Sequence, residues 1–499
     1  MIEYDVVIAG GGSAGCTLAA RLSEDPARRV LLLEAGPDYT ADELPADLAS
    51  SLNLTTTHDW GFEDEPRADG RRVPLPRGRV LGGCSSTNAT YAVRGHRANY
   101  DAWAELAGPE WGYEEVLPTF RRMEHDLDMQ GPYHGQGGPL PVRRYATREL
   151  TPLSRAFLEA AVRLGHAPVA DHNHPEAIGA GPAPMTSINF TRQSAARRYV
   201  WPHRARPNLT VRAGVTVDRV RFEGRRARAV VLAGGEEIAA DRLVLSAGAY
   251  GSPAILLRSG VGPAADLAAL GIDVVADRRG VGENLSDHPL VVVAYAAPSS
   301  SVGSEAPPAF QTLLTYQSAL HRGPGYDMHI VPQSVLPMEG SPTGFAYAFL
   351  CSVVLPRALG RVALTSRDPR VLPRIETGFL DHPDDRARMT EVVKVARRLA
   401  ATAPLSELGA LELAPGPAIT TDAEIDAFVE ANVTTYFHPV GSCRMGAAPD
   451  AVVDAHGKVH DLEGLWVLDA SVMPSIPGIN TNLPTIMIAE RGAAWLAAS

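Results

Sequence analysis

The most constraining feature of this chain is the N-terminal stretch YDVVIAGGGSAG, in which a run of glycines follows an apolar segment. Tyr4–Ala9 is expected to form a buried strand, Ser13–Glu24 has the apolar spacing of a helix, and Val30–Glu34 is a second apolar strand. A strand–helix–strand unit of about 30 residues is the usual crossover between parallel strands. The chain is therefore predicted to contain a parallel α/β layer.

The glycines of this turn follow the pattern Gly10-x-Gly12-x-x-Gly15. Between a strand and a helix, this pattern indicates a dinucleotide site, because the three glycines permit a tight turn, the approach of a pyrophosphate, and close helix–strand packing. Glu34, at the end of the second strand, is placed to accept hydrogen bonds from ribose hydroxyls and to repel a 2′-phosphate. The pattern alone does not separate FAD from NAD.

Other glycine-rich segments lie far along the chain, at 76–91, 245–262 and 467–485. Several separate backbone loops that converge on one ligand suit a long, buried cofactor such as FAD better than a diffusing NAD.

The remaining pattern predicts two interleaved domains. Strands at Leu243–Ala247 and Leu465–Asp469 and a closing helix at Pro484–Ala497 extend the α/β layer, whereas the short alternating runs between about 290 and 380 favour an antiparallel sheet. The fold class is therefore α/β, with a Rossmann-like FAD-binding domain and a smaller substrate domain built on an antiparallel sheet. We assign the FAD-binding domain to 1–150, 190–289 and 435–499, and the substrate-binding domain to 151–189 and 290–434. Residues 298–308 are expected to form a flexible loop.

Composition excludes several classes of partner. The 499 residues carry 46 basic and 57 acidic side chains, a formal charge of −11, which argues against nucleic acid or an anionic membrane as partner. We find neither an apolar run that spans a bilayer nor a secretory signal, so no membrane span is expected. Four separated cysteines form no disulfide framework, which favours a reduced, cytoplasmic setting. No metal is expected, because the histidines around Asp171 have the spacing of a polar loop.

These segments together resemble the glucose–methanol–choline (GMC) oxidoreductases, a family of FAD-dependent alcohol oxidases and dehydrogenases. The resemblance runs from Asp5 to Arg491 and is carried by four segments: PRGRVLGG with Asn88, GSPAILLRSGVG, GVGENLSDHP and HPVGSCRMG.

The resemblance implies a role for many individual residues. Those implied to hold the cofactor are Gly10, Gly12, Ser13, Ala14, Gly15, Glu34, Ala35, Val80, Gly83, Asn88, Ala89, Thr90, Val217, Ala247, Gly248, Ser252, Asp469, Ala470, Pro484 and Thr485. Tyr436 and Phe437 are expected in the substrate pocket, and His438 and Asn482 match the family's catalytic pair.

His438 is suited by type to accept a proton near neutral pH. Asn482 offers an amide donor for the substrate oxygen, and it precedes a helix whose positive end would face the flavin. The simpler interpretations are a buried histidine bonded to a backbone carbonyl and an asparagine that caps a helix. His288 is expected to be a structural hydrogen-bonding residue.

Thr87 stands where some choline-oxidising members carry a histidine that is covalently linked to FAD. A threonine hydroxyl cannot form that bond, so FAD is expected to bind non-covalently, and choline becomes a less favoured substrate.

The expected reaction is oxidation of a primary or secondary alcohol to the carbonyl, with the proton removed by His438 and the hydride transferred to flavin N5. A small apolar or aromatic alcohol is favoured, because no cluster of polar residues suited to a sugar stands out. The electron acceptor is either O2 or, in a dehydrogenase, a quinone or protein. A non-redox lyase or light-driven flavoprotein on the same fold is the remaining alternative.

Overall fold

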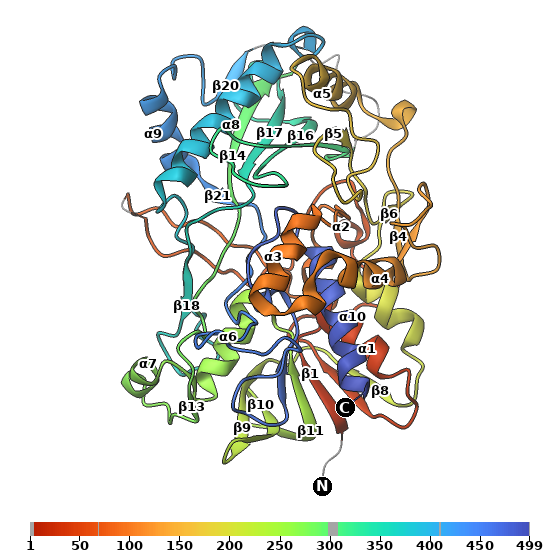
Figure 1. The fold of residues 1–499 in the computed structure, drawn as a ribbon, viewed down its shortest axis with the longest axis vertical. Helices are drawn as coiled ribbons and strands as arrows, with labels where there is room; N and C mark the ends of the chain where they lie inside the picture. The colour runs from red at the N-terminus through yellow and green to blue at the C-terminus, as the bar shows by residue number, and fades with distance from the viewer. Residues whose placement is uncertain (1–3, 68, 298–307, 409–410, 499) are drawn as a thin grey trace.

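A computed structural model describes residues 4–67, 69–297, 308–408 and 411–498. Two seven-stranded sheets lie at opposite ends of the long axis, and the helices α3 (Arg97–Ala107) and α4 (Tyr113–Met123) lie between them (Figure 1). The segment expected to be a flexible loop, 298–308, falls almost wholly outside the described residues.

The first sheet has seven strands and contains the N-terminal unit. Its main path runs, in spatial order, through β8 (Leu209–Arg212), β2 (Val30–Leu33), β1 (Tyr4–Ala9), β11 (Glu237–Leu245), β10 (Arg226–Leu232) and β9 (Val217–Glu223), and β22 (Leu465–Val467) also pairs with β11. β8, β2, β1, β11 and β22 are parallel, whereas β9 and β10 form an antiparallel extension.

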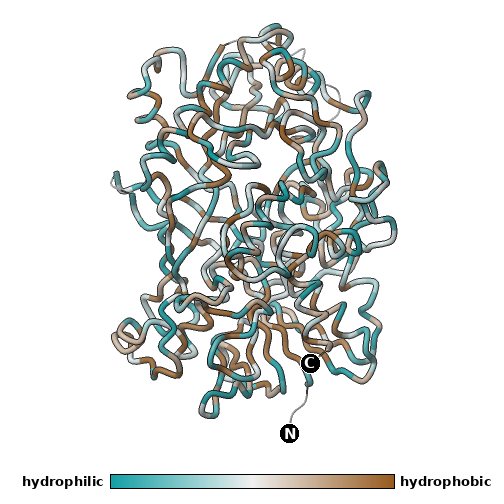
Figure 2. Tube along the Cα trace, in the orientation of Figure 1, coloured by the Kyte–Doolittle hydropathy of each residue, from teal (hydrophilic) through white to brown (hydrophobic). Residues whose placement is uncertain are grey.

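β1 and β2, in the parallel part of the sheet, contain continuous apolar runs, as expected of strands that helices cover. β1 and β2 are buried along almost their whole length, and Figure 2 shows hydrophobic stretches gathered in this part of the molecule. α1 (Ser13–Leu22) packs against α10 (Asn482–Ala498), so the first and last helices of the chain are neighbours. α6 (Gly248–Arg258) follows β11 directly.

The second sheet is antiparallel and also has seven strands. Its main path is β20 (Glu412–Ala414), β14 (Pro289–Ala296), β17 (Phe345–Val353), β16 (Met328–Pro337), β15 (Thr312–Tyr316) and β5 (Gly179–Pro182), with β21 (Thr434–Thr435) paired to β14. The helices α5 (Pro152–Arg163), α8 (Pro383–Ala401) and α9 (Asp422–Asn432) belong to this end of the molecule (Figure 1).

Alternation along these strands gives the sheet two different apolar faces. Ile330, Phe349 and Cys351 share one hydrophobic cluster with α5 and α8. Val331 and Leu350, which are paired across β16 and β17, point into another cluster on the opposite face. Because both faces are apolar, one can be covered by helices while the other forms a cavity wall.

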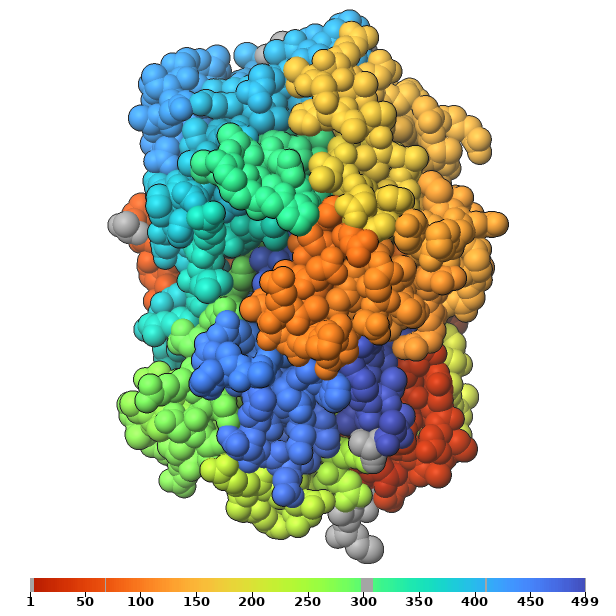
Figure 3. Space-filling model, viewed as in Figure 1, coloured from red at the N-terminus to blue at the C-terminus, as the bar shows by residue number. Residues whose placement is uncertain are grey.

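The mixed α/β fold with a second, antiparallel sheet confirms the predicted fold class. β1 has the bounds expected from the sequence, and the closing helix begins two residues earlier than predicted, at Asn482. Both sheets take strands from segments distant in sequence, and in Figure 3 the segment around α3 lies against C-terminal residues. The domain boundaries given above stay a prediction.

In the described part of the chain, no helix combines the length and the apolar character needed to cross a membrane. All four cysteines are free thiols.

Candidate active site

One cavity extends from the glycine turn after β1 to the inner face of the second sheet. Residues expected from the sequence make up much of its lining, namely Gly10, Gly12, Ser13, Ala14, Glu34, Ala35, Gly83, Asn88, Ala89, Val217, Ala247, Gly248, Tyr436, Phe437, His438, Asp469, Ala470, Asn482 and Thr485. The fold therefore gathers segments from both ends and the middle of the chain around one elongated space.

Five of the residues expected at the cofactor are not part of this lining: Gly15, Val80, Thr90, Ser252 and Pro484. Val80 and Thr90 are almost fully buried, and the backbone N–H of Thr90 donates to Asn88 Oδ1 at 2.9 Å. Ser252 contacts a lining residue instead of the cavity: its hydroxyl donates to Asp469 Oδ2 at 2.6 Å. These residues support the cavity wall from behind.

The glycine turn combines tight packing with one open position. A Cβ on Gly15 would lie 1.9 Å from the carbonyl oxygen of Gly10, so the helix and strand meet there without room for a side chain. A Cβ on Gly12 would meet nothing within 4 Å, although Gly12 lines the cavity. The open space at Gly12 is therefore available to a ligand that approaches the backbone.

Two buried carboxylates hold the loops of the cofactor end. Glu34 accepts from the backbone N–H groups of Gly11 at 2.8 Å and Gly36 at 2.7 Å. Burial raises the pKa of Glu34 to about 7, although these N–H groups oppose the rise. Asp469 accepts from the backbone N–H of Gly248 at 2.8 Å and from that of Ser471 at 2.8 Å, and so joins α6 to the loop after β22.

Two helix N-termini meet beside the cavity. α1 begins at Ser13 and α10 begins at Asn482, and the Ser13 hydroxyl donates to Asn482 Oδ1 at 2.8 Å. The first N–H groups of a helix are unpaired and carry partial positive charge, so this end of the cavity favours a ligand with negative groups. An elongated dinucleotide with a pyrophosphate fits that arrangement.

His438 lies farther along the cavity and contacts two neighbours through its ring. Its Nδ1 is 3.0 Å from Nδ1 of His288, and its Nε2 is 3.0 Å from Nδ2 of Asn480. An amide nitrogen donates, so Nε2 of His438 accepts, which leaves Nδ1 as the protonated nitrogen that donates to His288. His288, expected to be only structural, thus contacts the candidate base.

The surroundings of His438 keep its imidazole neutral. Burial lowers its pKa well below the ordinary value, and the neighbouring His288, Arg77 and His329 lower it further. Burial likewise lowers the pKa of His288 to about 3. A neutral, buried imidazole whose Nε2 accepts hydrogen bonds can receive a proton from a group bound in the cavity.

The catalytic pair of His438 and Asn482 stays a prediction, and the structure adds a second asparagine that contacts the His438 ring. The amide that reaches His438 belongs to Asn480, and the Asn482 side chain is bonded to Ser13 instead. Both asparagines line the cavity. In the sequence GINTNLPT the two residues are of the same type and almost adjacent, so nothing local distinguishes them. The one indication in the sequence that Asn480 could also reach the site is that asparagine occurs twice around the start of the closing helix.

The part of the cavity beyond His438 is apolar and aromatic. The residues that line it there are Tyr91, Phe310, Val331, Leu350, Tyr436 and Phe437. The ring of Tyr436 lies 4.7 Å from that of His438, centroid to centroid. Among the described lining residues the carboxylates are Glu34, Asp59 and Asp469, none of which belongs to this apolar cluster.

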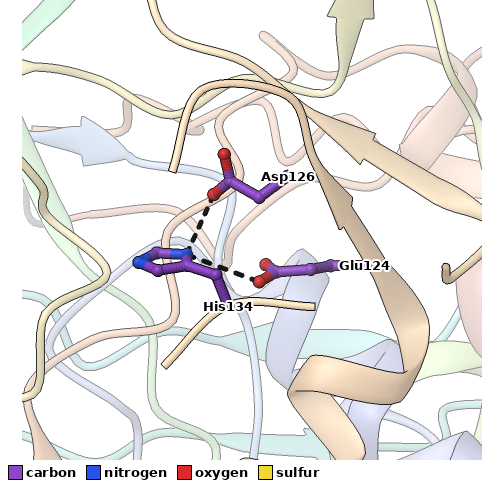
Figure 4. A group of neighbouring side chains, drawn as sticks. All are labelled: Glu124, Asp126 and His134. Atoms are coloured by element: carbon purple, nitrogen blue, oxygen red, sulfur yellow. Dashed lines mark ion pairs between the residues drawn. The ribbon is translucent and has the colours of Figure 1, made fainter. Parts of the chain in front are cut away.

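A separate buried cluster has the composition of a metal site but is already neutralised. Glu124, Asp126 and His134 gather with His134 between the two carboxylates (Figure 4). Arg94 forms an ion pair with Glu124, and Arg144 lies 3.0 Å from Asp126. The arginines and a protonated histidine balance the acidic groups, so the geometry is that of an ion network.

This network predicts a pH-dependent stability. Burial alone lowers the pKa of His134, but Asp126, Asp171 and Glu124 outweigh burial and raise it to about 10. A raised pKa contributes stability that is complete below the unfolded value of about 6.5 and is lost as pH rises through about 10. His134→Gln should therefore lower the free energy of unfolding by about 3–5 kcal/mol at pH 6.

Denaturant unfolding at pH 6 and at pH 9.5 measures this difference. The loss of unfolding free energy in His134→Gln should be smaller at pH 9.5 than at pH 6. His174 is exposed, so His174→Gln should have little effect on stability at either pH. An equal loss in His134→Gln at both pH values would contradict a charged His134.

Comparison with known proteins identifies the family. The fold and the cavity indicate the class first: an α/β protein whose glycine turn and two helix N-termini lie beside one elongated cavity that suits a dinucleotide. The sequence model of the GMC oxidoreductase family matches in two parts, residues 4–290 and 356–489. The chain belongs to the GMC oxidoreductases, FAD-dependent enzymes that act on CH–OH groups, which confirms the predicted family, enzyme class and cofactor type.

Individual relatives cover nearly the whole chain. An oxygen-dependent choline dehydrogenase of Chromohalobacter salexigens is 38% identical, over 98% of this chain and 94% of its own. A protein of the same description from Brucella anthropi is 36% identical, over 99% and 95%. The crystal structure of pyridoxine 4-oxidase from Mesorbium loti superposes with a TM-score of 0.92 at 34% identity, over 100% of both chains.

Proposed function

We propose that this protein oxidises a neutral, small apolar or aromatic alcohol to the carbonyl, with His438 as the base. The observation that carries the proposal is the position of His438: Nε2 meets the amide of Asn480 at 3.0 Å, at the boundary between the cofactor end and the apolar end of one cavity. FAD, when bound, supplies the acceptor for the hydride of the alcohol carbon. The residues of the chain handle the proton and the position of the substrate.

In the proposed reaction the alcohol hydroxyl replaces the Asn480 amide as the donor to Nε2 of His438, which takes the proton as the carbonyl forms. Asn480 donates its amide N–H to the alcohol oxygen, where negative charge develops. Aromatic and aliphatic walls, including Tyr436, Phe310 and Leu350, exclude water and hold an apolar substituent. Asn482 is assigned to the cofactor rather than to the substrate, because its partner is Ser13 at the start of α1.

Choline is the second candidate substrate, because the choline dehydrogenases named above are 36–38% identical over almost the whole chain. Tyr91, Phe310 and Tyr436 could hold a quaternary ammonium by cation–π contact. The carboxylates among the described lining residues are Glu34 and Asp469, which hold the loops of the cofactor end, and Asp59, which accepts from the backbone N–H of Arg77 at 2.6 Å. A neutral alcohol is therefore favoured, because a cation would need a further carboxylate to balance it.

A substrate panel tests this proposal. Purified enzyme should show anaerobic flavin reduction by benzyl alcohol and related neutral alcohols at lower concentrations than by choline. Preference for choline would replace the neutral alcohol with the second candidate. Flavin that stays oxidised with every alcohol would overturn the redox function and favour a lyase.

We further propose O2 as the electron acceptor, which is supported by the descriptions of the relatives as oxygen-dependent or as an oxidase. Hydrogen peroxide formed in aerobic turnover without added acceptor measures this. Turnover only with an added quinone would point to a dehydrogenase.

Non-covalent attachment of FAD is proposed because Thr87, which lines the cavity, offers only a hydroxyl. Denaturation should release the flavin into solution, and flavin that stays with the polypeptide would contradict this.

A cytoplasmic location is likewise proposed, supported by the four free thiols. Fractionation of the native cells would test that location.

A further inference from the structure

Asp287 is a buried carboxylate that contacts the backbones of both histidines at the candidate site. It is 3% exposed and does not line the cavity. Its Oδ1 accepts from the backbone N–H of His288 at 2.8 Å and from that of His438 at 2.9 Å. One oxygen atom therefore ties together two segments that lie 150 residues apart, at the place where their imidazole rings meet.

The second carboxylate oxygen holds the turn that precedes His438. The Thr435 hydroxyl donates to Asp287 Oδ2 at 2.6 Å and accepts from the backbone N–H of Phe437 at 2.7 Å. Phe437 has a φ of +67°, a left-handed conformation that is unfavourable for a bulky residue. The carbonyl oxygen of Phe437 accepts from Arg77 Nη2 at 2.9 Å. A strained turn of this kind persists when its surroundings fix it, and here they do so from both sides.

Asp287 also places an ionisable group against the backbones of the two histidines. Burial raises its pKa to about 6, although Thr435, Arg77 and the backbone N–H groups oppose the rise. The ionisable side chains that interact with it are Arg77 and Tyr250, whereas His288 and His438 contact it through their backbone N–H groups. Above that pKa Asp287 is ionised, and a carboxylate next to His438 stabilises the imidazolium that forms when the ring accepts a proton.

We propose that Asp287 is the positioning residue of this site: its carboxylate fixes the backbones of His288 and His438 and supports the positive charge that develops on His438. The inference rests on the proposed function, in which His438 is the base. Asp287 touches neither the cavity nor the reacting atoms, so it acts through His438.

The variant Asp287→Asn separates charge from shape. Its Oδ1 can still accept both backbone N–H groups and its Nδ2 can donate to Thr435 Oγ1, so the turn is kept and the charge is removed. With benzyl alcohol as the probe, the limiting rate of flavin reduction should fall at least about tenfold, while the apparent Kd for the alcohol stays close to that of the wild type. The acidic limb of the rate against pH should move to lower pH, because the lost charge lowers the pKa of His438.

Asp64 provides a matched control. It is also buried, and it accepts the backbone N–H of Thr377 at 2.9 Å and the Thr377 hydroxyl at 2.6 Å, outside the cavity lining. Burial raises the pKa of Asp64 too. Asp64→Asn should therefore affect stability without changing the rate of flavin reduction or its pH profile. An Asp287→Asn enzyme that behaves in the same way would overturn the proposal.

Thr435 keeps the inference testable if Asp287→Asn does not fold. Thr435→Val removes the hydroxyl link to Phe437 and should slow flavin reduction, whereas Thr435→Ser keeps the hydroxyl and should restore the rate. Wild-type rates in Thr435→Val would count against positioning through this turn.

A readout independent of turnover separates this inference from the proposed function. The imidazole N–H proton between His288 and His438 should give a low-field NMR resonance in the FAD-loaded wild type that is shifted or lost in Asp287→Asn and unchanged in Asp64→Asn. If no alcohol reduces the wild-type flavin, the proposed function fails, and this resonance alone decides whether Asp287 positions the pair. An unchanged resonance in Asp287→Asn would contradict the positioning role of Asp287, whichever substrate the enzyme uses.

Discussion

His438→Ala is expected to bind FAD like the wild type but to slow flavin reduction by an alcohol by about 10²–10⁴-fold, the usual contribution of a general base. The effect should be large because the described neighbours of the ring offer no ready substitute: burial lowers the pKa of His288, and that residue lies outside the cavity lining. Anaerobic stopped-flow absorbance of the flavin measures the rate directly.

A control for this variant comes from the same region of the chain. His460 contacts the carbonyl oxygen of Gly446 at 2.9 Å and does not line the cavity, so His460→Ala should reduce the flavin at the wild-type rate. Asn480→Ala should share much of the defect of His438→Ala, whereas Asn482→Ala should mainly weaken FAD binding. A wild-type rate in His438→Ala would remove His438 from the mechanism.

Gly12→Ala is expected to give a folded protein that has lost at least about 100-fold in FAD affinity, or about 2.7 kcal/mol. The new methyl group meets nothing within 4 Å in the protein itself, but it enters the open space where a pyrophosphate would approach the backbone. Gly15→Ala should instead destabilise the fold, by about 1–3 kcal/mol or more, because its Cβ would lie 1.9 Å from a backbone oxygen.

Titration of the apoprotein with FAD, followed by flavin fluorescence, gives the affinity, and denaturant unfolding of the apoprotein gives the stability. Gly137→Ala is the control, since its exposed Cβ would also meet nothing within 4 Å. Equal FAD affinity in Gly12→Ala and the wild type would show that the cofactor does not use the glycine turn.

The two predictions concern the cofactor end of one cavity and its boundary with the apolar end, and the fold explains why the two ends adjoin. The parallel sheet presents helix N-termini at its edge, which suits the negative groups of a dinucleotide. The antiparallel sheet presents an apolar face, with Val331 and Leu350 toward the cavity. His438 comes from the segment that leaves β21 of the second sheet and returns to the first.

Sequence alone determined the local features of this protein. The apolar run of β1, the glycine turn and the start of α1 follow from periodicity and glycine placement within a dozen residues, and the structure reproduces them. The family, the fold class and the gathering of glycine-rich loops were also predicted, because the motifs are contiguous segments whose conformations are set by their own residues.

The tertiary structure decided which side chains meet. Whether Asn480 or Asn482 reaches His438 depends on how the loop before α10 turns, and the sequence places both in the same short segment. The contact of His288 with His438 joins two segments that are distant in the chain, and so do the hydrogen bonds that Asp287 accepts from both. Such contacts are fixed by the packing of whole sheets against one another, which leaves no periodic signal in the residues that make them.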